Sequence, residues 1–156
     1  MGLFKKKTSE TSAGSQETLD KFTNDMIKTA NSFVINTIND FKNLNFSVKS
    51  LEVIDNMLEE ASDFYEEMSE PQRQNLIASV GSYIFEVARH NFGGKYFWYD
   101  QLNQPILVTG QPEFEVSIVA FDKVKGRLEN GKEDNIPFYF AGYVERVQNK
   151  QSGMIV

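Results

Sequence analysis

The sequence predicts an α+β fold: N-terminal amphipathic helices packed on a three-stranded antiparallel meander, followed by two C-terminal helices. Apolar residues recur at spacings of three and four through residues 18–92, which is the period of a helix. The period changes to two between residues 95 and 119, which indicates strands, and helical spacing returns after residue 122. A small sheet needs a cover for its apolar face, and helices are the elements available to supply it.

The first helix is predicted over residues 18–41, where the apolar stripe recurs along the whole segment. Ser50 is a suitable cap for a second helix, whose apolar stripe extends from Leu51 to Met68. Acidic residues fill the opposite side of this second helix. Its core-facing and solvent-facing sides are therefore expected to be well separated.

A third helix has three start signals that agree: a hydroxyl cap at Ser69, a proline in the first turn, and Gln72 three residues after the serine. Gly93-Gly94 is expected to end it, since glycine adopts the left-handed conformation of a C-terminal cap without steric cost. Gly81 lies inside this helix, where glycine costs about 1 kcal/mol relative to alanine. We therefore expect another backbone to approach closely at Gly81.

Residues 95–99 and 106–109 are aromatic or β-branched runs that predict a hairpin with a long turn, and residues 114–119 predict a third strand. The connections are too short for parallel crossovers, which need a dozen or more residues. The sheet is therefore expected to be antiparallel, with helices on only one face. Along the first strand, alternation places Tyr96 and Trp98 on one face and Phe97 and Tyr99 on the other.

Residues 122–129 predict a fourth helix, and Asp134 is expected to cap the last one. We predict one domain over residues 17–156, because the sequence shows no internal repeat and no sign of a second domain. Residues 1–16 are expected to form a flexible tail, since they have little apolar surface to bury. Their lysines offer at best a weak contact with an anionic membrane, so no stable membrane association is expected.

Acidic charge is concentrated in the first half of the chain. The net charge is -6, and residues 17–92 hold 13 acidic and 6 basic residues. Eight acids follow one another without an intervening base; they are Glu52, Asp55, Glu59, Glu60, Asp63, Glu66, Glu67 and Glu70. Such a field repels phosphate backbones, which argues against nucleic-acid binding. The run is either a solvated helix face or a docking surface for a basic protein, with Glu59, Asp63 and Glu66 as its candidate binding residues.

The absence of cysteine and the presence of a single histidine exclude most familiar catalytic and zinc sites. Weak catalytic candidates are Glu86, Arg89 and His90, because spacings of three and four place the glutamate beside both bases. In a cleft, His90 could act as a general acid or base, with Arg89 holding an anion. On an open surface the same residues form an ordinary intrahelical ion pair. Tyr96 and Trp98 are the candidate stacking residues, and the alternative for them is burial beneath the helices.

The helix Gly81-Ser82-Tyr83-Ile84-Phe85-Glu86-Val87, the Gly93-Gly94 turn with its aromatic strand, and the Lys123-Val124…Arg127-Leu128…Gly131 helix form one pattern. Over about residues 44–145 this pattern resembles a group of uncharacterised bacterial proteins of the domain-of-unknown-function type. Phe85 stands where the group has glycine. The resemblance implies an α+β domain and a bacterial source, but no reaction. Some proteins of the group are suspected to lie near toxin and immunity systems.

These observations favour a non-enzymatic protein-binding or immunity-type module in the bacterial cytoplasm. We expect a basic protein as its partner and no cofactor or metal, and self-association stays open. The alternative is a small enzyme or ligand-binding protein that uses Glu86, Arg89 and His90. A concave cavity around Glu86 and His90 would favour the alternative, whereas a flush surface pair would favour the first interpretation.

Overall fold

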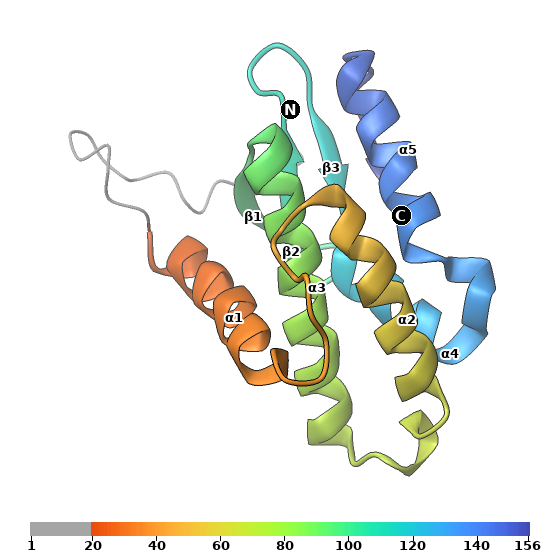
Figure 1. The fold of residues 1–156 in the computed structure, drawn as a ribbon. Coiled ribbons are helices and arrows are strands. Elements are labelled where there is room, and N and C mark those ends of the chain that lie inside the picture. The colour runs from red at the N-terminus through yellow and green to blue at the C-terminus, as the bar shows by residue number, and fades with distance from the viewer. Residues whose placement is uncertain (1–19) are drawn as a thin grey trace.

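A computed structural model describes residues 20–156, and within them the chain forms an α+β fold, as predicted (Figure 1). The helices are α1 (Lys21–Thr37), α2 (Leu51–Ser62), α3 (Glu70–Phe92), α4 (Ala120–Asn130) and α5 (Ile136–Gln148). The strands are β1 (Lys95–Tyr99), β2 (Gln104–Thr109), β3 (Val116–Ile118) and β4 (Gly153–Ile155). Short 3₁₀ turns are η1 (Val48–Ser50), η2 (Tyr65–Glu67) and η3 (Gly131–Asp134). The predicted flexible tail, residues 1–16, lies outside the described residues.

The sheet has the order β1-β2-β3-β4. The antiparallel pairing predicted for the first three strands is confirmed, with Phe97 opposite Ile106 and Val108 opposite Ser117. The prediction of a three-stranded, wholly antiparallel sheet is wrong, because β4 pairs in parallel with β3. The segment containing α4 and α5 supplies the long crossover that a parallel pair requires. Three residues were too few to reveal β4 as a strand in the sequence.

Helix α3 begins and ends where the sequence predicts. The side chain of Ser69 accepts a hydrogen bond from the N–H of Gln72, and the Gln72 side chain accepts one from the N–H of Ser69. Gly93 ends the helix with a φ of 78°. Helices α1 and α2 both end earlier in the chain than the sequence predicts. Helix α1 ends at Thr37 and not at residue 41, and α2 ends at Ser62, after which hydrogen bonds between residues three apart tighten the chain.

Helix α3 lies at the centre of the main core, where it packs against α1 and α4 (Figure 1). Its residues from Val80 to Ala88 are all buried. The close approach predicted at Gly81 is present, but a side chain makes it and not a backbone. A Cβ atom at Gly81 would lie 2.4 Å from Cδ1 of Phe121. Glycine at this position therefore lets the start of α4 pack against α3.

The two faces of β1 separate its aromatic residues as predicted. Tyr96 and Trp98 both make edge contacts with the Phe22 ring of α1, with ring centroids 6.1 Å and 6.3 Å from it. Phe97 and Tyr99 instead belong to a second apolar cluster together with Ile106, Val108 and Val119. The sheet therefore contributes to two cores, and the main one joins it to the helices.

Two predicted caps are corrected by the structure. Asn135, and not Asp134, caps α5, since its side chain accepts a hydrogen bond from the N–H of Phe138. Asp134 accepts a hydrogen bond from Lys123 instead, at 2.8 Å. Ser50 makes no side-chain cap to α2, because its hydroxyl is used in contacts with Ser47 and with the hydroxyl of Tyr83.

Candidate functional site

A polar cavity of about 740 Å³ lies where the C-terminal end of α2, the turn η2, the start of α3 and the end of α4 meet. We call it the acidic basin. Its lining residues are Ser62, Asp63, Tyr65, Glu66, Glu67, Arg73, Leu128 and Glu129. The four carboxylates are exposed, and the lining contains one guanidinium, that of Arg73. The basin is therefore a concave, predominantly negative surface.

The only base in the basin lining, Arg73, is held by its own neighbours. Its Nε donates to the carbonyl oxygen of Tyr65, and its Nη2 donates to the carbonyl oxygen of Glu66, both at 2.9 Å. The guanidinium also lies 4.6 Å from the centroid of the Tyr65 ring. These contacts fix η2 against α3. They direct the guanidinium to backbone oxygens and an aromatic ring, and none of these three contacts uses a carboxylate of the basin.

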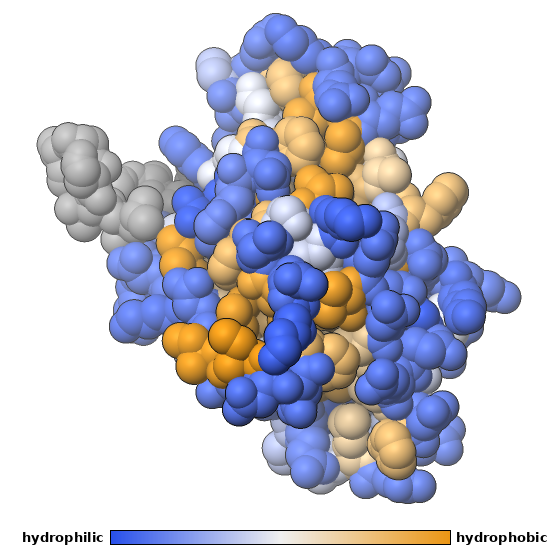
Figure 2. Space-filling model, in the orientation of Figure 1, coloured by the Kyte–Doolittle hydropathy of each residue, from blue (hydrophilic) through white to orange (hydrophobic). Residues whose placement is uncertain are grey.

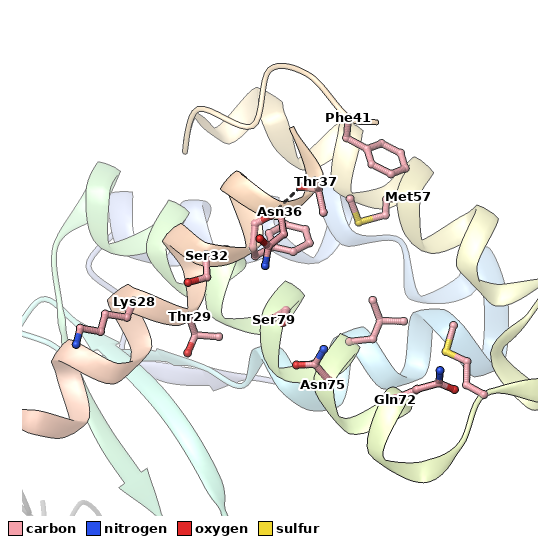
Figure 3. Close-up of a pocket in the computed structure, with 13 residues that line it drawn as sticks. Lys28, Thr29, Ser32, Asn36, Thr37, Phe41, Met57, Gln72, Asn75 and Ser79 are labelled. Carbon is pink, nitrogen blue, oxygen red and sulfur yellow. Dashed lines mark hydrogen bonds between the residues drawn. The ribbon is translucent and has the colours of Figure 1, made fainter. Parts of the chain in front are cut away.

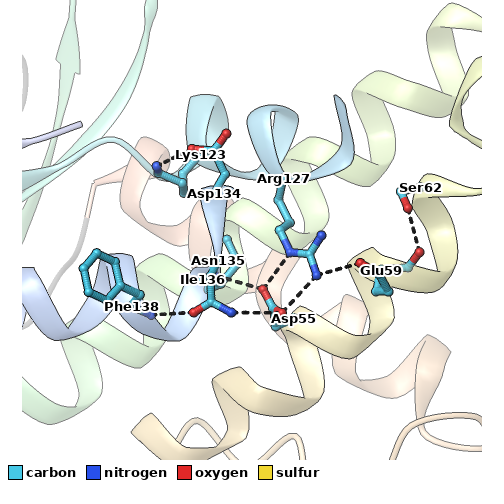
Figure 4. A network of polar contacts seen from close by, with 9 residues as sticks. All are labelled: Asp55, Glu59, Ser62, Lys123, Arg127, Asp134, Asn135, Ile136 and Phe138. Atoms are coloured by element: carbon cyan, nitrogen blue, oxygen red, sulfur yellow. Dashed lines mark hydrogen bonds and ion pairs between the residues drawn. The ribbon is translucent and has the colours of Figure 1, made fainter. Parts of the chain in front are cut away.

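A buried ion pair holds the two walls of the basin together (Figure 4). Arg127 of α4 is 1% exposed, and it donates from Nε and Nη2 to the two carboxylate oxygens of Asp55 in α2, at 2.8 Å and 3.0 Å. Nη2 also donates to Glu59 at 2.9 Å. Asp55 accepts further hydrogen bonds from the N–H of Ile136 and the amide of Asn135. Asp55 of α2 thus joins α2 to both α4 and α5.

The charges of this pair support each other. Burial by itself raises the pKa of Asp55, but the hydrogen bonds from Arg127 and Ile136 and the charges of Arg127 and Lys132 outweigh it, so the pKa lies below its ordinary value of 3.8. The hydrogen bond from Arg127 to Asp55 raises the pKa of the guanidinium in turn. The pair is therefore ionised at neutral pH, and its energy depends on both partners being present.

The acidic residues predicted on one side of α2 are divided between the buried ion pair with Arg127 and the acidic basin. Asp55 was predicted on the solvated side of α2 and is instead buried, because it binds Arg127 and accepts a hydrogen bond from the N–H of Ile136 at the start of α5. Glu59 uses one oxygen to bind Arg127, while its side chain stays 51% exposed. Of the three candidate binding residues, Asp63 and Glu66 line the basin. Glu129 joins them from α4, and only the folded arrangement reveals it.

The cluster of Glu86, Arg89 and His90 forms, but around a buried carboxylate. Glu86 is 1% exposed and accepts two hydrogen bonds from Arg89, at 2.8 Å and 2.9 Å. It also accepts one from the hydroxyl of Tyr96, at 2.7 Å. His90 Nε2 lies 3.5 Å from the same carboxylate. The intrahelical ion pair of Glu86 and Arg89 therefore forms, but its carboxylate is buried and not on an open surface, and it links α3 to β1.

His90 is itself part of an aromatic stack. Its ring lies 4.6 Å from the ring of Phe46, which stacks in turn on Tyr83 at 4.8 Å. The Phe46 backbone is held on both sides, by the Tyr83 hydroxyl and by the amide of Asn91. These contacts fix the connection between α1 and α2 onto α3.

The aromatic candidates on β1 differ in accessibility. Tyr96 is 1% exposed, and burial together with the nearby charge of Glu86 raises its pKa well above 10. The prediction that Tyr96 is available to stack on a ligand is therefore wrong. Trp98 is half-buried against Phe22. The signal that could have placed Tyr96 inside is its position ten residues after Glu86, across a Gly-Gly turn that folds β1 back beside α3.

A second cavity, of about 650 Å³, lies between α1 and the first half of α3 (Figure 3). We call it the helical groove. In the view of Figure 2, hydrophobic surface gathers over the C-terminal end of α1, whereas the outer side of α2 is hydrophilic. The exposed apolar residues of that end of α1 are Ile35 and Ile38. Neither the acidic basin nor the helical groove is lined by Glu86, Arg89 or His90.

Within residues 20–156, no three His, Asp or Glu side chains gather in an arrangement that could hold a metal ion. In this range none of the helices combines the length and the apolarity that crossing a membrane would require. No family model, curated protein or solved structure matches the chain.

Proposed function

We propose that the protein is a non-enzymatic, cytoplasmic protein-binding module of the immunity type, and that a basic partner protein docks on the acidic basin. The observation that carries the proposal is the basin itself: Asp63, Glu66, Glu67 and Glu129 line one concave surface, and the guanidinium of Arg73 is directed to backbone carbonyls. A lysine or arginine side chain entering there would meet several carboxylates. Such complementarity gives fast, specific association that weakens with salt.

The rigid walls of the basin support this proposal. The Asp55–Arg127 pair fixes α2 to α4, with Asp55 two helical turns before Asp63 and Arg127 in the same turn of α4 as Glu129. A preformed site loses less conformational entropy on binding than a mobile one. The helices that carry the charges of the basin are therefore held together, which favours a docking surface over a merely solvated helix face.

The enzyme alternative has less support. Glu86 accepts three hydrogen bonds at 2.7–2.9 Å and is 1% exposed. A general base needs a lone pair directed at a substrate, in a cleft that the substrate can enter. For these reasons we propose that Glu86, Arg89 and His90 stabilise the fold and do not catalyse a reaction. The kinship with the bacterial domain-of-unknown-function group remains part of the proposal, and its motif residues Tyr83, Glu86 and Arg127 are all buried.

Two charge-reversed variants with the same net charge test the proposal. The basin variant carries Asp63→Lys, Glu66→Lys and Glu67→Lys, and we exclude Glu59 because it binds Arg127. The control variant carries lysine at three exposed acids on other parts of the chain, which are Asp40, Asp100 and Glu145. The probe is an oligoarginine peptide, and its affinity is measured by calorimetry at low and moderate salt.

The wild type is expected to bind with an affinity that falls as salt rises. The basin variant should lose about ten-fold or more in affinity, while the control should lose only about two- to three-fold. Equal losses in both variants would show that the peptide responds to net charge alone, and the docking proposal would then be wrong. Thermal unfolding of both variants checks that the fold is retained.

A further inference from the structure

The helical groove shares no lining residue with the acidic basin, although the two linings adjoin at the start of α3, and it has the composition of a ligand site. Its apolar floor contains Phe33, Met57 and Leu76, and Phe41 and Met68 add to it from the two connecting segments. Polar side chains of α1 and α3 form the two rims. A volume of about 650 Å³ is within the range of small-molecule sites. Such sites combine an apolar lining with a few placed polar groups, as this groove does.

The polarity of the groove changes along its length (Figure 3). Lys28 lies at one end, whereas Met57 and Phe41 lie at the other. Between them, Asn36 of α1 and Asn75 of α3 reach into the groove from opposite sides. A ligand that lies along the groove therefore meets a positive charge, then amides and hydroxyls, and then aromatic and thioether surface.

The polar groups in the middle of the groove have hydrogen-bonding capacity to spare. The hydroxyls of Thr29 and Thr37 bond to carbonyl oxygens of their own helix, at 2.8 Å. No hydrogen bond within the described part of the chain involves the side chains of four other lining residues, namely Ser32, Asn36, Asn75 and Ser79. An amide group of a ligand could both donate to and accept from these side chains.

The charge of the groove is opposite to that of the molecule. The chain has a net charge of -6, yet the groove lining contains one ammonium, that of Lys28, and no carboxylate. A cationic ligand would find no partner charge in the lining, whereas an anionic head group would find Lys28. The groove extends about 10 to 14 Å along α1 and α3, which is short for a protein partner that needs about 800 Å² per side.

We propose that the helical groove binds a small amphiphile with an apolar chain, a central amide and a terminal carboxylate, as in an N-acyl amino acid. The chain lies on Phe33, Leu76 and Met57, the amide lies between Asn36 and Asn75, and the carboxylate meets Lys28. This inference goes beyond the proposed docking function and does not rest on it, because the two cavities share no residue.

The test compares three probes that differ only in the head group. They are N-octanoylglycine, its uncharged glycinamide, and the cationic amide of octanoic acid with ethylenediamine. Calorimetry measures their binding to the full chain below the concentration at which the probes form micelles. We expect the carboxylate probe to bind best and the cationic probe to bind least. Equal affinities, or no binding of the carboxylate probe up to its solubility limit, would overturn the proposal.

Matched variants locate the ligand. Asn75→Trp fills the groove, whereas Gln74→Trp adds the same ring one residue earlier on α3, outside the groove lining. Both positions are exposed, so both variants should fold. We expect Asn75→Trp to abolish binding of N-octanoylglycine and Gln74→Trp to leave it within about two-fold. Unchanged binding by Asn75→Trp would place the ligand elsewhere and contradict the inference.

The head group is tested with a second pair of variants. Lys28→Gln should reduce the affinity for N-octanoylglycine about ten-fold and leave the glycinamide unaffected. Lys21→Gln, on the same helix but outside the groove, should change neither. Two further measurements distinguish other occupants. Binding to anionic phospholipid vesicles without binding of the free probe, or a dimer in sedimentation that buries the groove, would each overturn the assignment.

Discussion

Replacing Arg127 by methionine is expected to destabilise the protein more than any surface substitution. The change removes two hydrogen bonds to Asp55 and one to Glu59. Asp55 would then keep the N–H of Ile136 at 2.9 Å and the amide of Asn135 at 3.3 Å, but no positive charge bonded to it. Methionine is unbranched and flexible, so it refills much of the volume that the arginine stem occupied.

The magnitude follows from the burial of the pair. Arg127 is 1% exposed and Asp55 has a side chain that is 12% exposed. Removing one partner of a buried pair costs about 3–5 kcal/mol, since it leaves an uncompensated charge. For a chain of this length, each kcal/mol lowers the melting temperature by about 2–4 °C, so we expect a drop of roughly 6–20 °C. The same loss should loosen the acidic basin, because the pair joins its walls.

Urea unfolding followed by circular dichroism measures the difference in free energy of unfolding. The matched control is Lys21→Met, which breaks an exposed ion pair with Asp25 at 2.9 Å and should cost less than about 0.5 kcal/mol. Glu59→Gln should cost less than Arg127→Met, because its side chain is half exposed. A loss below about 1 kcal/mol for Arg127→Met would refute the view that this pair holds α2 and α4 together.

Three further predictions concern packing and pH. Gly81→Ala should lower the free energy of unfolding by about 1–2 kcal/mol, because its Cβ would meet Phe121. Gly142→Ala should raise it by up to about 1 kcal/mol, because beyond its chain neighbours and the backbone of its own helix the new Cβ has no atom within 4 Å. Equal effects of the two changes in urea unfolding would contradict this. Because the pKa of Asp55 is lowered, its contribution to stability is present above the ordinary value of 3.8 and is lost as pH falls below that value. The unfolding free energy of the wild type should therefore fall more steeply in acid than that of Asp55→Asn. Parallel curves for the two proteins would argue against this role of Asp55. Burial raises the pKa of Tyr143 to about 12 and that of Tyr96 well above 10, so the stability that these tyrosines contribute is complete below pH 10 and is lost as pH rises through the folded-state pKa values. Tyrosinate absorbance should show both residues ionising only as the chain unfolds. Titration of all 6 tyrosines near pH 10 in a folded protein would be inconsistent with this burial.

Local signals in the sequence were sufficient for the elements that depend on neighbouring residues. The start of α3 was predicted because Ser69 and Gln72 cap it through hydrogen bonds within one turn. The hairpin of β1 and β2 was predicted because alternation and a short connection leave few other arrangements. Strand β4 was not, since three residues carry no periodicity and its parallel pairing depends on where α5 returns the chain.

The candidate site was predicted only in part for a similar reason. A run of acids without bases identifies a negative helix, but it does not say which carboxylates are neutralised by distant residues. Arg127 lies 72 residues after Asp55 in the sequence and still removes that carboxylate from the surface. Glu129 reaches the basin from the same distant helix. Asp63 and Glu66 were identified correctly as exposed acids of one surface, and its concave shape required the folded chain.

The most direct test of the docking proposal is to map where a basic peptide binds. Backbone amide signals are followed by nuclear magnetic resonance while the oligoarginine peptide is added to the wild-type protein at moderate salt. The proposal predicts saturable shifts centred on residues 62–67, Arg73 and Glu129, with little change at the exposed acids Asp40, Asp100 and Glu145. Shifts spread evenly over all exposed acids, or centred on the helical groove, would contradict a docking site in the acidic basin.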